Sequence, residues 1–292
     1  MLPSSPSSGW RLTDCPRDAL QGWKAAVPTA DKVGYLSALM QVGFDVLDAG
    51  SFVSPKAIPQ MADTADVLEA LPVTSTRVLA IVANLRGAQD ALAHGRPDIL
   101  GFPFSISETF QRRNAGTGMD EAWTRLDTIR NAVERAGKEL VVYVSMGFGN
   151  PYGDAWSAER VADWSRRLHR EMGVKHLALS DTVGQATAPV VSAVFQEVVG
   201  ALPDCHIGAH LHGRPDQTAA LMQAAWEAGC RAFDGALGGH GGCPMAKDDL
   251  VGNLATEVLM QAPEAWGEAP REWNASALAE AQQWRAAIFE GR

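Results

Sequence analysis

The sequence predicts an α/β protein that folds as a single (β/α)8 TIM barrel with a short C-terminal helical extension. The first observation is that eight short runs of apolar and β-branched residues alternate with longer stretches whose apolar residues recur every three or four positions. The second is that the connections between these elements are short, which implies parallel strands joined by right-handed crossovers. Eight such units close a barrel, and a chain of 292 residues can hold one as a single domain.

The eight predicted strands lie, in order, at residues 10–15, 44–50, 77–84, 98–105, 139–147, 174–181, 205–212 and 231–239. Helical segments such as ADKVGYLSALMQVG and AERVADWSRRLHREMG separate them, and each of these two ends in a glycine, a common helix stop. We expect residues 10–262 to form the catalytic barrel and residues 263–292 to form a helical extension packed on it. Residues 1–9 are expected to be a disordered lead.

Composition and charge exclude several classes of protein. A hydrophobic content of 46% allows a large core, and a net charge of −9 argues against nucleic acid or an anionic membrane as a partner. No apolar run approaches the roughly 20 residues of a membrane-spanning helix, and the first residues lack the regions of a signal peptide. The four cysteines form no CxxC pair, so we expect reduced thiols and a cytoplasmic protein.

Polar residues gather at the predicted carboxyl ends of the strands, where barrel enzymes place their catalytic groups. The amino ends of the same strands hold no comparable set, and this asymmetry predicts an enzyme. The polar residues at the carboxyl ends are Asp14, Arg17, Asp18, Asp48, Asn84, Ser105, Ser145, Asp181, His210 and His212, followed by the glycine stretch that leads to Cys243.

His210 and His212 are two positions apart on a predicted strand, so both imidazoles face the same side, the mouth of the barrel. Such a pair alone is as readily two polar strand residues as a metal site. With Asp18 it offers two nitrogens and one carboxylate oxygen, which suits a divalent ion with open coordination positions. Mg²⁺ or Mn²⁺ is the expected ion, and Zn²⁺ or Co²⁺ is also able to bind. The alternative for Asp18 is a helix cap.

The stretch GGHGGCPM, residues 238–245, surrounds Cys243 with glycines. Glycine gives the backbone freedom and offers no side chain to pack the thiol, so we interpret the stretch as a loop able to move. An inert loop thiol is the alternative. The other cysteines, Cys15, Cys205 and Cys230, lie in apolar runs and are expected in the core.

Several segments resemble the hydroxymethylglutaryl-CoA lyases, a family of metal-dependent TIM-barrel lyases and aldolases with an Arg-Asp motif. The resemblance runs in order along roughly residues 10–260, and SFVSPK and GGCP with GNLATE are specific to the lyase branch. The segments are PRDALQ (16–21), GSFVSPKAIPQM (50–61), NLRG (84–87), SETFQRRN (107–114), SDTVG (180–184), HLH (210–212), GGCP (241–244) and GNLATE (252–257).

The resemblance implies roles for individual residues. The implied metal ligands are Asp18, His210, His212 and Asn253, and the implied catalytic residues are Arg17, Asp48, Asp181, Cys243 and Glu257. The candidates for substrate or CoA binding are Asn84, Arg86, Arg112, Arg113 and Arg214. Each has a structural alternative: Asp181 can form a turn, Arg112 and Arg113 can face solvent, and Asn253 and Glu257, four residues apart, would share a face if helical.

The activity that the resemblance implies is a metal-assisted retro-aldol cleavage of a 3-hydroxy-3-methylglutaryl-CoA-like substrate to acetyl-CoA and a keto acid. An acyl-CoA is then the partner, and a homodimer or higher homo-oligomer is expected. The sequence departs from the family at Asp48, usually Glu, at Gly213, usually Asp, at residues 214–216, and at His240. These departures leave citramalyl-CoA or a longer branched acyl-CoA as alternative substrates. A condensing synthase and a non-catalytic binding barrel are the alternatives from other classes.

Overall fold

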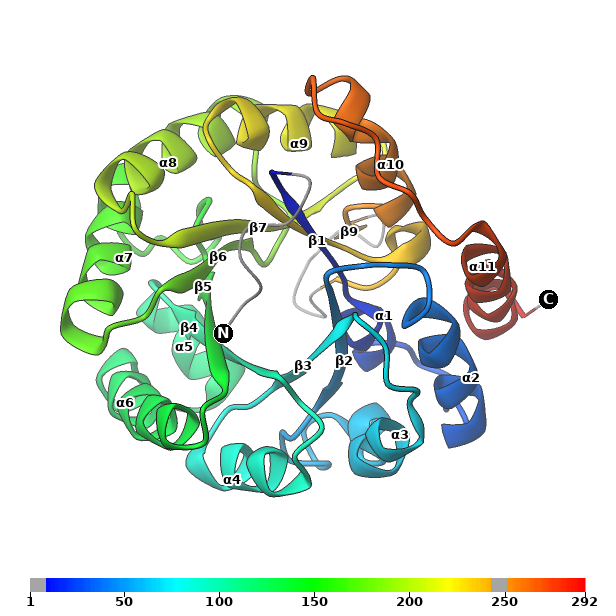
Figure 1. The fold of residues 1–292 in the computed structure, drawn as a ribbon. Helices are drawn as coiled ribbons and strands as arrows, with labels where there is room; N and C mark the ends of the chain where they lie inside the picture. The colour runs from blue at the N-terminus through cyan, green and yellow to red at the C-terminus, as the bar shows by residue number, and fades with distance from the viewer. Residues whose placement is uncertain (1–8, 243–250, 292) are drawn as a thin grey trace.

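Eight parallel strands close into a barrel with helices around it in the computed structural model, which describes residues 9–242 and 251–291 (Figure 1). Neighbouring strands in the chain are neighbours in the sheet, and β1 pairs with β8 to close it. The strands are β1 Arg11–Asp14, β2 Val46–Ser51, β3 Arg77–Ile81, β4 Ile99–Ser105, β5 Glu139–Ser145, β6 His176–Asp181, β7 His206–Gly213 and β8 Ala232–Gly235. The predicted TIM barrel is confirmed.

The helices follow the strands and cover the outside of the barrel (Figure 1). They are α1 Pro16–Gln21, α2 Thr29–Leu39, α3 Thr64–Ala70, α4 Leu85–His94, α5 Glu108–Ala115, α6 Met119–Arg135, α7 Ala158–Met172, α8 Ala188–Ala201, α9 Thr218–Glu227, α10 Thr256–Gln261 and α11 Ala275–Phe289, with 3-10 turns η1 Pro59–Met61, η2 Leu237–Gly239 and η3 Ala262–Glu264. The glycine stop predicted at Gly173 is present: its φ is +67° and its N–H donates to His169 O.

The eighth strand is shorter than the predicted 231–239. Its last residue is Gly235, because the next residue, Ala236, already bridges to Ala255, and the turn η2 begins at Leu237. A short strand not foreseen from the sequence, β9 Gly252–Asn253, pairs antiparallel with the end of β7. These two features bring the chain after β8 back over the carboxyl ends of the strands.

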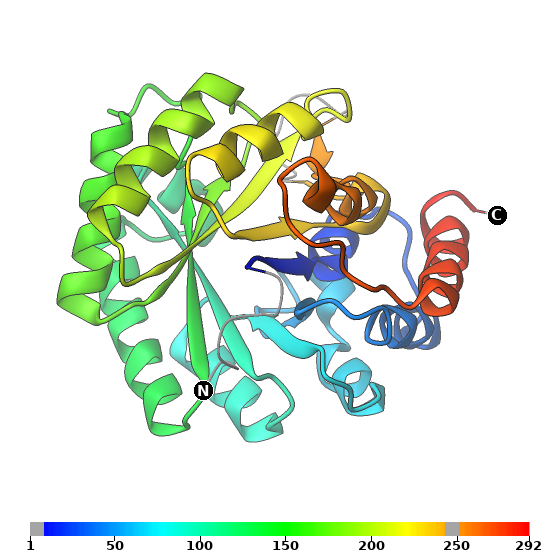
Figure 2. The ribbon, with the colours of Figure 1, turned by 45° about the horizontal axis from the view of Figure 1, so that its top comes forward.

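The C-terminal helix α11 lies outside the barrel against α2 (Figure 2). A Cβ atom at Gly34 of α2 would overlap the ring of Trp284, so this glycine permits the close approach of the two helices. Phe289 packs edge-on against Tyr35 and Trp23, which ties the end of α11 to α2 and to the loop after α1. The predicted helical extension is thus present, while the exact domain bounds stay a prediction, and most of the lead lies outside the described residues.

Apolar side chains fill both the barrel and the space between strands and helices. The alternation of strand residues places Leu79, Ile81, Ile99 and Tyr143 in one cluster separate from the larger core under the helices. Among the described residues, no helix is long and apolar enough to cross a membrane. The inner cluster forms a base beneath the polar residues at the carboxyl ends of the strands.

Asp14 is a fully buried carboxyl at the end of β1. Its Oδ1 accepts a hydrogen bond of 2.5 Å from Thr256 Oγ1, and its Oδ2 has no partner among the described residues. Burial raises the pKa of Asp14 from 3.8 to about 8, and the neighbouring Glu257 adds to the effect. The carboxyl therefore stays largely neutral near neutral pH and joins β1 to α10.

Asp14→Asn should make the unfolding free energy less dependent on pH. The pKa of Asp14 is raised in the folded state, so its contribution to stability is complete below an unfolded value of 3.8 and is lost as the pH rises through about 8. Asparagine keeps the shape and the Thr256 contact but does not titrate. Urea denaturation from acid to alkaline pH measures the difference; equal slopes for both proteins would show that Asp14 does not titrate in this range.

Candidate active site

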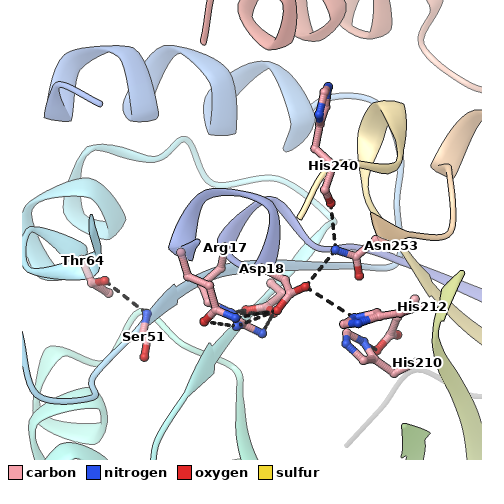
Figure 3. A network of polar contacts seen from close by, with 11 residues as sticks. Arg17, Asp18, Ser51, Thr64, His210, His212, His240 and Asn253 are labelled. Carbon is pink, nitrogen blue, oxygen red and sulfur yellow. Dashed lines mark hydrogen bonds and ion pairs between the residues drawn. The ribbon is translucent and has the colours of Figure 1, made fainter. Parts of the chain in front are cut away.

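Three of the predicted metal ligands come together at the mouth of the barrel (Figure 3). Asp18 on α1 and His210 and His212 on β7 are buried, and each offers a ligand atom within 4.8 Å of the others. The fourth, Asn253, lies on β9 directly opposite His212, and its Nδ2 donates to Asp18 Oδ2 at 2.8 Å. The structure thus gathers all four predicted ligands in one place.

His212 has the surroundings expected of a metal ligand. Both ring nitrogens are buried, and neither makes a hydrogen bond of ordinary geometry among the described residues, although the backbone of Thr182 lies close enough to favour the protonated ring. Nε2 lies 3.7 Å from Asp18 Oδ2. Burial lowers the pKa of His212 to about 4, so the imidazole is neutral at neutral pH and has a free lone pair. A buried polar group without a good partner is costly, and a divalent cation between His212 and Asp18 would give the imidazole a partner.

His210 is oriented by a residue that the sequence analysis missed, Asp234. Its Nδ1 lies 3.0 Å from Asp234 Oδ2, and the two residues are direct neighbours in the pairing of β7 with β8. Burial alone would lower the pKa of His210, but the bond to Asp234 raises it. A carboxylate on one ring nitrogen is the usual partner of a metal-binding histidine, because it leaves the other nitrogen for the ion. The sequence feature that could have identified Asp234 is its place as an acidic residue near the end of the predicted eighth strand.

A second buried group competes for the same histidine. Cys15, His210 and Asp234 also offer ligand atoms within 4.8 Å of one another. Burial and the surrounding carboxylates raise the pKa of the Cys15 thiol well above its ordinary value, so it stays protonated and is a poor ligand. Within this group, His210 Nδ1 and Asp234 Oδ2 already form a hydrogen bond with each other. The group formed by Asp18, His210 and His212 therefore fits a divalent ion better.

Arg17 is buried between two carboxylates. It follows Pro16, the first residue of α1, so the start of this helix directly after β1 places Arg17 at the barrel mouth. Its Nη2 and Nε donate to Asp48 at 2.6 and 3.0 Å, and its Nη1 donates to Asp18 at 3.1 Å and Gln21 at 2.7 Å. These contacts engage four of the five N–H groups of the guanidinium. The fifth, on Nη2, has no acceptor among the described residues.

The three predicted acids differ in their surroundings. Asp48 binds Arg17 directly. Asp181 accepts the N–H groups of Gln185 and Ala186, so it does form the turn that was its alternative role, and burial raises its pKa to about 6. Glu257 accepts from Gly238 N at 2.9 Å.

The shared helix face considered for Asn253 and Glu257 is wrong. Asn253 lies on β9, and α10 begins only at Thr256, because Ala255 is still extended with a ψ of 121°. The pairing of β9 with β7 holds this segment out of the helix. Asn253 reaches Asp18 from β9, while Glu257 lies on α10 and contacts the backbone of Gly238.

Two of the predicted substrate-binding residues line a cavity of about 450 Å³. Asn84 and Arg86 contribute from the start of α4, while Ser51 and Thr64 contribute from β2 and α3. Asn84 is also the cap of α4 and accepts from Gly87 N at 2.9 Å. Ser51 lies at the end of β2, the strand that also carries Asp48. The cavity therefore begins at the end of the strand whose Asp48 binds Arg17.

Three further arginines lie apart from the lining of this cavity. Arg112 on α5 pairs with Glu108 at 2.6 Å, and the Arg113 guanidinium lies 4.8 Å from the centre of the Tyr152 ring. Arg214 follows β7 and pairs with Asp216 at 3.6 Å. Their role in binding substrate stays a prediction.

Glycines of the stretch 238–242 pack closely against the site. Gly241 has a φ of +94°, and a Cβ there would lie 2.7 Å from Ala19 Cα and 2.8 Å from Asp18 O. Glycine is needed here because the backbone contacts α1 directly. Cys243, the predicted catalytic thiol, lies outside the described residues. Cys15 and Cys230 are buried as expected, but Cys205 is only partly buried, since it precedes β7 at the surface, with its Sγ 3.2 Å from His169 Nδ1.

Comparisons with known proteins agree with one another. The HMGL-like family model matches residues 12–284. The mouse protein named mitochondrial hydroxymethylglutaryl-CoA lyase is 35% identical over 248 residues, 84% of this chain and 75% of that protein. The rat protein named cytoplasmic 3-hydroxy-3-methylglutaryl-CoA lyase is 34% identical over 246 residues, 84% of this chain and 71% of that protein.

Solved structures give the same result. The HMG-CoA lyase from Brucella melitensis superposes with a TM-score of 0.88 at 28% identity and covers 96% of this chain and 99% of its own. The HMG-CoA lyase from Acinetobacter baumannii, solved in complex with coenzyme A and 3-methylmalate, superposes with a TM-score of 0.86 at 28% identity, over 96% and 90% of the two chains.

Asp234→Asn should weaken metal binding. An amide can donate as well as accept, so it no longer fixes which nitrogen of His210 has the proton, and the Mn²⁺ dissociation constant should rise about 10–100-fold. Titration followed by the electron paramagnetic resonance signal of free Mn²⁺ measures it. Asp45→Asn is the matched control, because Asp45 pairs with Arg271 away from the site. Equal dissociation constants for Asp234→Asn and wild type would contradict the role of Asp234.

Proposed function

The chain belongs to the HMGL-like family and is a carbon–carbon lyase of acyl-CoA substrates, and from this premise we propose that it cleaves 3-hydroxy-3-methylglutaryl-CoA to acetyl-CoA and acetoacetate. The relatives that bear the name of this activity are about 35% identical and match most of the chain, which supports the substrate. The observation that favours catalysis over a binding role is the buried group of Asp18, His210 and His212 at the barrel mouth, whose ligand atoms lie within 4.8 Å of one another.

We propose Asp18, His210, His212 and Asn253 as the residues that hold a divalent ion. The carboxylate, two imidazoles and an amide suit Mg²⁺ or Mn²⁺, with Zn²⁺ or Co²⁺ as alternatives. Such an ion, when bound, lowers the pKa of the substrate's tertiary alcohol and stabilises the ketone that forms. Burial alone would raise the pKa of Asp18, but Arg17 and the two histidines lower it below its ordinary value, so the ligand is a carboxylate.

Arg17 is the proposed donor to the thioester oxygen. When the bond between C2 and C3 breaks, its electron pair moves into the acetyl-CoA half, and negative charge develops on this oxygen. The free N–H on Nη2 can donate to it, while Asp48 and Gln21 hold the guanidinium in place. A fixed donor in a buried site stabilises developing charge without having to reorganise.

Two proton transfers complete the reaction. A base removes the proton of the C3 hydroxyl, and an acid returns a proton to C2 of the enolate to give acetyl-CoA. Cys243 as that acid, and Asp181 and Glu257 as further active-site acids, are proposals from the resemblance to the family. For Asp48, the bidentate contact with Arg17 supports a positioning role.

The cavity beside β2 is the proposed place for part of the CoA moiety. Asn84 and Arg86 line it, and a solved relative holds coenzyme A. Arg112, Arg113 and Arg214 are proposed as further contacts, with Arg214 the candidate for a different acyl tail. A cytoplasmic location and a homodimer or higher homo-oligomer are also proposals.

The proposed function predicts acetyl-CoA release from one member of a panel of 3-hydroxyacyl-CoA substrates. Purified protein with Mg²⁺ or Mn²⁺ should cleave 3-hydroxy-3-methylglutaryl-CoA, EDTA should abolish the activity, and added metal should restore it. Faster cleavage of citramalyl-CoA or a longer branched acyl-CoA would replace the substrate but keep the reaction. Full activity in metal-free protein, or none on any member of the panel, would overturn the proposal.

Arg17→Lys should lower kcat by at least about 10²-fold, although the charge is kept. A compact ammonium group cannot bind Asp48, Asp18 and substrate together as the planar guanidinium can. Steady-state kinetics on the cleaved substrate measure kcat and KM separately. If KM changes while kcat does not, Arg17 binds substrate without stabilising the transition state, and the proposed role is wrong.

A further inference from the structure

We propose that the C-terminal helix α11 positions the metal ligands Asp18 and Asn253 through His240, so that His240 and Arg285 are positioning residues of the site. This inference rests on the proposed metal-dependent function. Its basis is a continuous series of contacts that runs from the outer helix through the glycine stretch to Asp18, and Figure 3 shows the inner part of it.

The side chain of His240 is held by α11. Arg285 Nη1 donates to His240 Nε2 at 2.9 Å, and the imidazole stacks on the Phe289 ring with centroids 4.4 Å apart and an angle of 12° between the planes. Because a guanidinium can only donate, Nε2 is the acceptor in this hydrogen bond. The other hydrogen of Nη1 goes to Glu290 Oε1 at 2.7 Å. Two different contacts therefore fix the same ring.

The backbone of the glycine stretch is shaped to receive this contact. Gly238 has a φ of +74°, and a Cβ there would lie 2.9 Å from Arg285 Cδ. A side chain at this position would displace Arg285 from His240. The segment η2, which includes Gly238, is also in contact with α11.

The main chain of His240 continues the series to the metal ligands. Its carbonyl oxygen accepts from Asn253 Nδ2 at 2.9 Å, and the same nitrogen donates to Asp18 Oδ2 at 2.8 Å. An amide nitrogen has two hydrogens, so both bonds form together. Both partners are acceptors, so the amide nitrogen faces them and the orientation of the Asn253 amide is fixed. The carbonyl of His240 thus helps to set the orientation of the Asn253 amide beside Asp18.

A purely structural role for these contacts makes a different prediction. If His240 and Arg285 only pack α11 on the barrel, their loss lowers the melting temperature and leaves metal affinity unchanged. If they orient Asn253, metal affinity falls even where the protein remains folded. Mutation of a residue that orients a metal ligand commonly weakens metal binding about 10–100-fold.

The test compares Arg285→Met with Arg271→Met. Both variants replace an arginine by a side chain of similar length, but Arg271 pairs with Asp45 away from the site. Mn²⁺ titration of the full-length proteins, followed by the electron paramagnetic resonance signal of free Mn²⁺, should give a dissociation constant at least about 10-fold higher for Arg285→Met. Arg271→Met should bind Mn²⁺ like wild type, and Arg285→Lys, which keeps a donor, should recover part of the loss.

His240→Phe supplies a second test if Arg285→Met does not fold, because it keeps a ring for Phe289 and removes the Nε2 acceptor. It too should bind Mn²⁺ more weakly than wild type. Equal Mn²⁺ affinity in wild type and in the folded variants would overturn this inference alone. Wild-type protein that binds no Mn²⁺ and releases no acetyl-CoA would overturn the proposed function, and this inference with it.

Discussion

The buried carboxylate of Asp18 is the group on which the rest of the site depends. It accepts hydrogen bonds from Arg17 and Asn253 and lies 3.7 Å from His212, so α1, β9 and β7 all meet at it. Burying a charge is costly unless its partners surround it closely. Three features bring these partners close to Asp18. They are the short helix α1, the antiparallel pairing of β9 with β7, and the close approach of Gly241 to the backbone of Asp18.

The charges around Asp18 favour a cation. Arg17 contributes one positive charge, while Asp18 and Asp48 contribute two negative charges within hydrogen-bond distance of it. His212 is neutral because burial lowers its pKa to about 4. A carboxylate beside a neutral imidazole suits a divalent ion.

The sequence was sufficient for the barrel and for the direction of the two histidines, because strand alternation and period two are local properties. Local sequence patterns do not predict contacts between residues that are far apart in the chain. The bond between His210 and Asp234 depends on strand register. The position of Asn253 on β9, in place of a helix, depends on pairing with β7. The contact of His240 with Arg285 depends on where the C-terminal helix docks. The order of strands was predictable, while these partners required the structure.

The most direct test of the account is anomalous diffraction from crystals of the full-length protein grown with Mn²⁺. The account predicts one peak at the barrel mouth, bound by Asp18, His210, His212 and Asn253 at distances of roughly 2.0–2.3 Å, which are ordinary for oxygen and nitrogen ligands. A peak between Cys15, His210 and Asp234 instead, or no peak near Asp18 at a saturating concentration of Mn²⁺, would contradict it.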